Sequence, residues 1–147
     1  MSVQRYEDTL AGLLAGLDGK ARRQLAREIA RQLRQSQQKR IAAQLNPDGS
    51  AFAPRKPQIQ DKKGAIRRAM FSKLRTAKWL KTEANAGGAA VGFIGEVERI
   101  ARVHQYGLRD RAQRGGREVQ YPARALLGFA GQDIEAIAEK VLNRLQK

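Results

Sequence analysis

A helical pattern between Lys20 and Leu45 constrains the fold more than any other feature of this sequence. The apolar residues that line one side of the pattern, mostly four apart, are Ala21, Leu25, Ile29, Leu33, Ile41 and Leu45. At about 1.5 Å per residue such a helix would be roughly 37 Å long. We therefore expect its far end to project from the core or to lean on a neighbouring copy. The turn formers Asn46-Pro47-Asp48-Gly49 should end it.

Apolar residues at helical spacing also predict helices over residues 3–17, 64–78, 96–106 and 131–146. The first of these helices should end at Asp18-Gly19, where a C-terminal cap is expected. Its apolar face consists of Val3, Tyr6, Leu10, Leu13, Leu14 and Leu17. Gly107 is placed to stop the helix over 96–106.

Two short strands, 79–84 and 89–94, flank a glycine-containing turn and predict an antiparallel hairpin over about 79–94. Residues 108–119 hold alternating charges and two adjacent glycines with little to bury, which predicts a mobile loop. The length fits one domain, residues 1–147. The fold class predicted is α+β: a helix-rich single domain with long N-terminal helices, a small antiparallel sheet and a C-terminal helix.

Neither a membrane-spanning segment nor a secretion signal is predicted. No stretch approaches the roughly 18 uncharged apolar residues that a transmembrane helix needs. The first residues lack the basic start and continuous apolar run of a signal peptide. We therefore expect a soluble protein with no membrane partner.

Positive charge is concentrated in the middle of the chain. The net charge is +15, and residues 20–81 hold 18 basic and three acidic groups. The flanking segments 1–19 and 82–147 have net charges of −2 and +2. Such a field favours either a phosphate backbone or an acidic protein surface as a neighbour. The basic candidates for an interface are Arg22, Arg23, Arg27, Arg31, Arg34, Arg55, Lys56, Arg67 and Arg68.

Residues suited to catalysis or metal binding are scarce. There is no cysteine, and the single histidine, His104, is more simply a packing or hydrogen-bonding residue at a helix end. Carboxylates and His104 do not recur at metal-ligand spacing. The segment around Gly19-Lys20 lacks the other residues of a phosphate loop. We therefore expect neither an enzyme nor a cofactor or metal site.

Several short strings, in order, resemble the phage virion morphogenesis family, the tail completion proteins of contractile-tailed phages and their relatives. The most specific are Ala-Arg-Val-His-Gln-Tyr-Gly at 101–107 and Tyr-Pro-Ala-Arg at 121–124. The others are Pro47-Asp48-Gly49 with Phe52 and Arg55-Lys56, Met70-Phe71 with Leu74, Val91-Gly92-Phe93 with Gly95, and Leu127-Gly128. The likeness spans nearly the whole chain.

The resemblance implies a structural protein of the phage neck or tail end, which completes the tail and enables head–tail joining as a subunit of a ring. The expected partners are copies of the chain, as a hexamer or a dodecamer, and other neck, connector and tail proteins. The place implied is the virion, after assembly in the host cytoplasm. Candidate structural positions in the shared strings are Pro47, Asp48, Gly49, His104, Gln105, Gly107, Tyr121 and Pro122.

Two further expectations concern the proposed ring. Arg124 follows a rigid Tyr-Pro entry, where its planar fork could hold a carbonyl or carboxylate, so it is also a candidate interface residue. The basic middle segment could meet the acidic face of the last helix, Asp133, Glu135 and Glu139, in a neighbouring copy.

A basic, non-enzymatic DNA-binding protein is the alternative. The arginines could neutralise several phosphates, including those of DNA that passes through an assembly. No zinc-finger, RNA-recognition or basic-zipper pattern is present, and aromatic residues form only 5% of the chain. Contact with DNA would therefore be non-specific.

Overall fold

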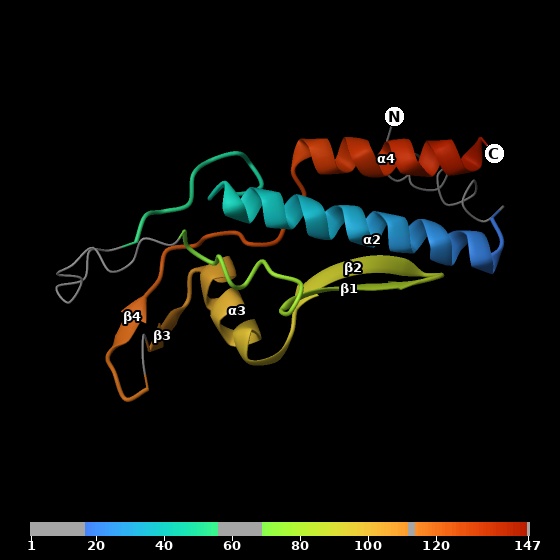
Figure 1. Cartoon of the computed structure of the whole chain (residues 1–147). Coiled ribbons are helices and arrows are strands. Elements are labelled where there is room, and N and C mark those ends of the chain that lie inside the picture. Colours follow the sequence, from blue (N-terminus) through green and yellow to red (C-terminus); the bar gives the residue numbers. More distant parts are fainter. Residues whose placement is uncertain (1–16, 56–68, 112–113, 147) are drawn as a thin grey trace, which may run out of the picture.

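The computed structural model describes residues 17–55, 69–111 and 114–146, and the long helix α2, Gly19–Ala42, runs through the middle of this part (Figure 1). The side chain of Asp18 caps the start of α2 by accepting a hydrogen bond of 2.7 Å from the Ala21 N–H. Asp18 thus begins this helix, whereas the sequence suggested it as the end of the preceding one. The helix predicted over 3–17 lies outside the described residues, except for Leu17.

The C-terminal end of α2 lies in the core, so the expectation that it projects was wrong. Ile41 is fully buried, and Gln37 and Arg40 are buried beside it. The helix ends three residues before Leu45 because Gln44 adopts a left-handed φ of 61° and the chain turns back. The N–H groups of Gln44 and Leu45 bond to the carbonyls of Ile41 and Arg40.

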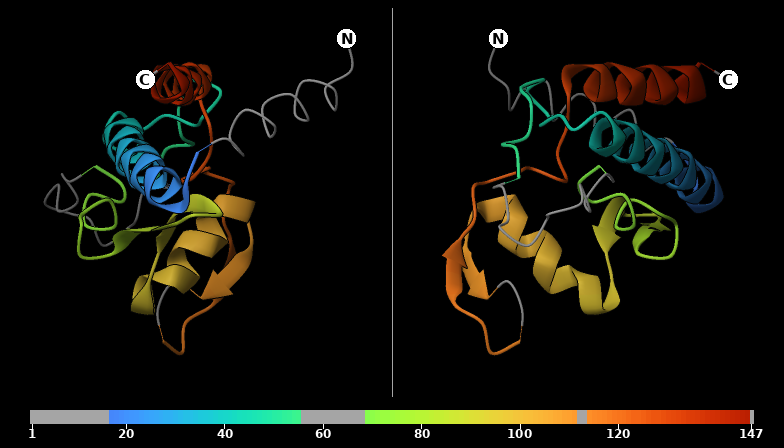
Figure 2. Two further views of the ribbon diagram at one scale, coloured as in Figure 1. Left: turned by 90° about the vertical axis from the view of Figure 1, so that its right-hand side faces the viewer. Right: turned by 60° about the vertical axis from the view of Figure 1, so that its left-hand side comes forward.

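The predicted hairpin is confirmed. Strands β1, Leu80–Asn85, and β2, Gly88–Phe93, pair antiparallel from Leu80 opposite Phe93 to Asn85 opposite Gly88. The hairpin packs on one side of α2, and the helix α4, Gly131–Leu145, packs on another (Figures 1 and 2). The last helix was predicted over 131–146, so it too is confirmed.

Residues 69–79 form consecutive turns, so the predicted helix over 64–78 was wrong in its described part. Phe71 has a left-handed φ of 65°, which interrupts a right-handed helix. That conformation turns the Phe71 ring toward Phe52, with ring centroids 5.7 Å apart. The packing of Phe71 therefore determines the local backbone conformation, in place of the helix that the apolar spacing predicted.

A short 3-10 turn η1, Gly95–Val97, leads into helix α3, Glu98–Tyr106, as the sequence predicted. Gly107 ends α3 in the left-handed conformation, with φ 64° and ψ 56°. The next segment was expected to be a loop over 108–119. Its two ends instead form the antiparallel strands β3, Arg109–Arg111, and β4, Glu118–Gln120.

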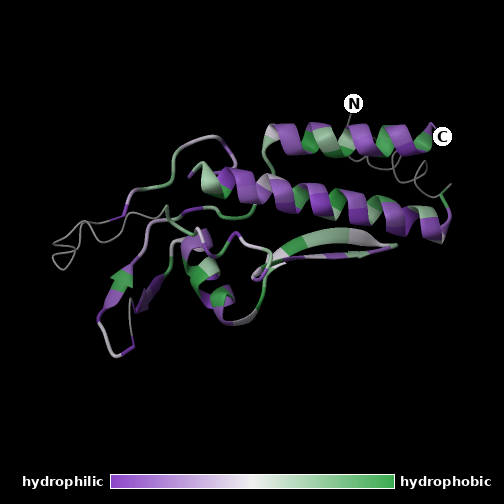
Figure 3. Ribbon diagram, in the orientation of Figure 1, coloured by the Kyte–Doolittle hydropathy of each residue, from purple (hydrophilic) through white to green (hydrophobic). Residues whose placement is uncertain are grey.

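The core lies where α2, α3 and the chain after β4 meet. Its buried residues are Ile41, Phe52, Ala101 and Leu126, with Met70, Phe71 and Phe93 packed against them. Figure 3 shows α2 as largely hydrophilic, with hydrophobic patches between hydrophilic ones. The predicted fold class, α+β with helices and small antiparallel sheets, is confirmed.

Candidate functional site

A row of exposed arginines follows α2. Arg23, Arg27 and Arg31 are exposed and four residues apart, so successive side chains start about 6 Å apart along the helix. Arg22 and Arg34 are half-buried instead. Arg22 lines an apolar groove beside α2. Of the five arginines that the sequence predicted here, three are therefore fully open to a partner, and we call them the arginine row.

The other basic candidates are not brought together with this row. Arg55 is exposed at the end of the first described segment, and its charge acts on Arg124. Lys56, Arg67 and Arg68 lie outside the described residues. Their part in an interface stays a prediction.

Arg124 is an interior residue, which corrects its assignment to an interface. Only 4% of it is exposed. Its Nε donates to the Ala53 carbonyl at 2.7 Å and its Nη2 to the Pro54 carbonyl at 3.0 Å. Burial, followed by the charge of Arg55, lowers the pKa of Arg124. The planar fork does hold carbonyls, as the sequence suggested, but they belong to the same chain.

His104 is enclosed by aromatic rings and by Arg124. Its ring centroid lies 4.8 Å from that of Phe71 and 5.0 Å from that of Tyr121. Arg124 Nη1 lies 3.1 Å from His104 Nδ1, and because a guanidinium only donates, Nδ1 must be the acceptor. Burial, and then the charge of Arg124, lower the pKa of His104 to about 4. The imidazole is therefore neutral at pH 7 and serves packing.

The Pro47-Asp48-Gly49 string forms a tight turn next to the core. Asp48 accepts hydrogen bonds from the Ser50 N–H at 2.9 Å and the Ser50 hydroxyl at 2.5 Å, which lower its pKa. Gly49 has a φ of 90°, which favours glycine. The ring of Pro47 lies so close to Gly128 that a Cβ at that position would overlap it. These motif residues therefore set the path of the chain.

The second motif closes α3 against the chain that follows β4. The Gly107 backbone approaches Ala123 so closely that an added Cβ would lie 3.0 Å from the Ala123 nitrogen. The Tyr121 N–H donates to the Leu108 carbonyl at 3.1 Å, and Pro122, beside it, is exposed. Glycine is thus required at 107 both for its conformation and for its close packing.

An extended segment, residues 124–128, is held by side chains in place of a neighbouring strand. Gln105 both donates to the Leu127 carbonyl and accepts from the Leu127 N–H, each at 2.9 Å. Gln37 makes the same pair of bonds with Gly128, at 3.0 and 3.1 Å. The two amide side chains thus act as substitutes for a β-strand partner.

Arg40 completes this arrangement. Its Nη1 donates to the carbonyls of Leu45 and Ala125 at 2.9 and 2.8 Å, and its Nη2 to that of Leu126 at 2.7 Å. Burial lowers the pKa of Arg40, and the charge of Asp133 partly opposes this effect. Sequence reasoning missed Gln37 and Arg40 as structural residues, because a polar patch on a helix usually faces water.

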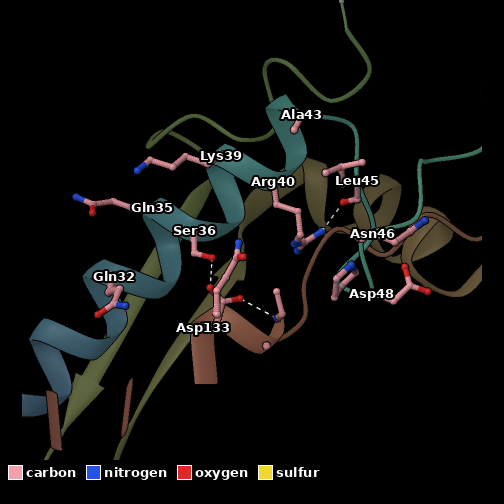
Figure 4. Close-up of a pocket in the computed structure, with 15 residues that line it drawn as sticks. Gln32, Gln35, Ser36, Lys39, Arg40, Ala43, Leu45, Asn46, Asp48 and Asp133 are labelled. Carbon is pink, nitrogen blue, oxygen red and sulfur yellow. Dashed lines mark hydrogen bonds between the residues drawn. The ribbon is translucent and has the colours of Figure 1, made fainter. Parts of the chain in front are cut away.

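A cleft of about 730 Å³, with many polar residues in its lining, lies between the second half of α2, the turn at 45–49 and the start of α4 (Figure 4). Asp133 lies in its wall, where it accepts from the Ser36 hydroxyl and from the Ala130 N–H. Only 4% of Asp133 is exposed, so it cannot form part of an acidic face for a neighbour, as the sequence suggested. Glu135 and Glu139 are exposed.

The side chains described above are suited to packing and to recognition of a partner. The buried polar side chains described above bind the chain's own backbone, and the described residues contain no group of three or more potential metal ligands. Arg99 and Asp110 form an ion pair. Over the segments covered by the structure, no helix is long and apolar enough to cross a membrane.

Comparison with known proteins identifies the family of this chain. Residues 1–146 match the sequence model of the phage virion morphogenesis family, so the chain belongs to that family. It is also similar to tail completion protein S of Escherichia phage P2, with 43% identity over 146 residues that cover 98% of this chain and 97% of that protein. No solved structure matches it significantly.

Proposed function

We propose that this protein completes the tail of a tailed bacteriophage and enables the joining of head and tail as a subunit of a ring at the neck or tail end. The observation that carries the proposal is the 43% identity to tail completion protein S along almost the full length of both chains. The protein acts in the virion, after assembly in the host cytoplasm, and without catalysis or a cofactor. Its further partners are other neck, connector and tail proteins.

The distribution of polar side chains supports an assembly role. The buried ones, Gln37, Arg40, Arg124 and Asp133, are bonded within the chain. Two exposed features suited to recognition are the arginine row and the apolar residues of α4. Ile134 and Leu142 are 59% and 53% exposed on that helix. Both features can be covered when copies associate.

A closed ring repeats one interface between two different faces of the subunit. The arginine row, Arg23, Arg27 and Arg31, is one suitable face. Glu135 and Glu139 of the next copy, next to the exposed Ile134 and Leu142, are the other. The arginines and the two glutamates are both spaced four residues apart on a helix, so successive positive charges can lie opposite successive negative charges. A hexamer is expected, and the same interface argument allows a dodecamer.

Charge reversal tests this interface. Light scattering should give a ring-sized mass for the wild-type protein, and smaller species for Arg27→Glu and for Glu139→Arg. An equimolar mixture of the two variants should recover the ring, because alternating copies place opposite charges at every interface of a ring with an even number of subunits. The double variant, which restores the pair in every interface, should recover it as well. Arg109→Glu, an exposed arginine on β3, is the matched control and should leave the mass unchanged. A wild-type monomer with native circular dichroism contradicts spontaneous ring formation.

Non-specific DNA binding is the second candidate, and the arginine row is the observation that favours it. Three arginines that each neutralise a phosphate give a slope of about −2.7 for the logarithm of the binding constant against that of salt. Under the assembly proposal, binding is weak and is lost at physiological salt. A monomer or dimer that binds duplex DNA tightly at that salt concentration would support the alternative.

A further inference from the structure

An apolar groove of about 460 Å³ runs beside the first half of α2. Its floor is formed by α2, with Leu25, Ala26, Ile29 and Leu33. One wall is the turn between β1 and β2, at 85–89, and the other is α4 with the residue Phe129 before it. Phe129 is 62% exposed at the rim. A groove of this composition is suited to an amphipathic helix.

The start of α2 lies at one end of this groove. Figure 1 shows the beginning of α2, the turn between β1 and β2 and the end of α4 at the same end of the molecule. Two contacts show that α2 and α4 are antiparallel: Glu28 pairs with Arg144 at 2.9 Å near the end of α4, whereas Ser36, later in α2, bonds to Asp133 at the start of α4. Any segment that enters α2 through Leu17 and Asp18 therefore starts beside the groove.

We propose that residues 3–16 of the same chain occupy this groove as a helix antiparallel to α2. Their apolar residues, spaced for one helical face, are Val3, Tyr6, Leu10, Leu13 and Leu14. Fourteen helical residues are about 21 Å long, and the α2 floor from Arg22 to Leu33 is about 17 Å long. The segment thus matches the groove in length as well as in chemistry.

The short connection favours the chain's own segment over that of another copy. Leu17 forms a bend and Asp18 is the cap of α2, so two residues are available to reverse the chain. Antiparallel helix pairs are commonly joined by two to five residues. A tether this short gives an effective concentration in the millimolar range, above that of a free neighbour. This inference does not depend on the proposed function.

Paired cysteines test the placement directly, because the natural chain has no cysteine. With the reversal at 17–18, Tyr6 lies opposite Ile29 of α2. Tyr6→Cys with Ile29→Cys should therefore form a disulfide under mild oxidation. The control pair, Tyr6→Cys with Arg27→Cys, places the second thiol on the exposed side of α2 and should stay reduced.

A non-reducing gel then separates the outcomes. The proposal predicts a monomer-sized band with loss of free thiols for the first pair alone. A dimer band would assign the groove to the segment of a second copy and overturn the proposal. No disulfide, with native circular dichroism, would also overturn it.

A second test leaves the segment itself unchanged. Phe129→Asp and Ile100→Asp replace exposed apolar residues, 62% and 49%, but only Phe129 lines the groove. Tryptic cleavage after Arg5 should become several-fold faster in Phe129→Asp and stay at the wild-type rate in Ile100→Asp. Equal rates in the two variants would show that the groove does not hold the segment.

Discussion

Replacing Gln37 with methionine would keep the approximate size of the side chain while removing its hydrogen bonds. Gln37 is 3% exposed. Its amide donates to the Gly128 carbonyl, accepts from the Gly128 N–H, and accepts from Arg40 Nη2 at 2.5 Å. Methionine offers no donor and only a weak acceptor, so the two backbone groups of Gly128 lose their partner.

The loss should be large for a single substitution. Each buried polar group left without a partner costs about 1–3 kcal/mol. Gly128 is half-buried and Arg40 Nη2 keeps its bond to Leu126, so the lower part of that range applies. We therefore expect Gln37→Met to lower the free energy of unfolding by about 3–5 kcal/mol in total. This is a large fraction of the ~5–15 kcal/mol by which such domains are stable.

Urea unfolding followed by circular dichroism measures this loss. At a slope of about 2 kcal/mol per molar urea, the midpoint should fall by roughly 1.5–2.5 M with the slope unchanged. Gln35→Met, an exposed position on the same helix, is the matched control and should shift little. Gln37→Glu keeps both bonds in which Gln37 is the acceptor, so its unfolding midpoint should fall less than that of Gln37→Met. Equal midpoints for Gln37→Met and Gln35→Met would refute the reasoning.

Three further predictions follow from the same interior. Because the pKa of His104 is lowered to about 4 from 6.5, its contribution to stability is complete above pH 6.5 and is lost as the pH falls toward 4. His104→Asn, which can still accept from Arg124, should flatten the unfolding free energy measured across that range, and an unchanged slope contradicts this. Gly128→Ala should lower the melting temperature because its Cβ would overlap Pro47, and Pro47→Ala should recover much of the loss only in that background. Arg124→Lys keeps the charge but replaces three separately placed nitrogens, which contact Ala53, Pro54 and His104, with a single one, so it should destabilise the folded monomer. Normal stability with failed assembly would instead support an interface role.

The periodic spacing of apolar residues correctly predicted those helices whose formation depends mainly on that spacing. The helix over 20–45 and the last helix were found with ends within about three residues, because each buries a stripe against a neighbour. The hairpin was found from its glycine-containing turn. The segment 64–78 also has helical spacing, yet its described part forms turns, since Phe71 is held in a left-handed conformation by contacts distant in sequence.

The polar interior could not be predicted from spacing. Arg40 and Asp133 are charged residues that a single sequence places on a surface, and their burial depends on carbonyls and N–H groups contributed by distant segments. The same is true of Arg124, whose partners lie about seventy residues away. Gly107 was predicted correctly as the residue that ends α3, because a glycine after a helix has a local signature.

Electron microscopy of particles made by a phage that lacks this protein tests the central claim most directly. If the protein completes the tail, such an infection should yield DNA-filled heads and separate tails, and the supply of wild-type protein in trans should restore joined, infectious particles. Complete infectious virions in its absence would contradict the account.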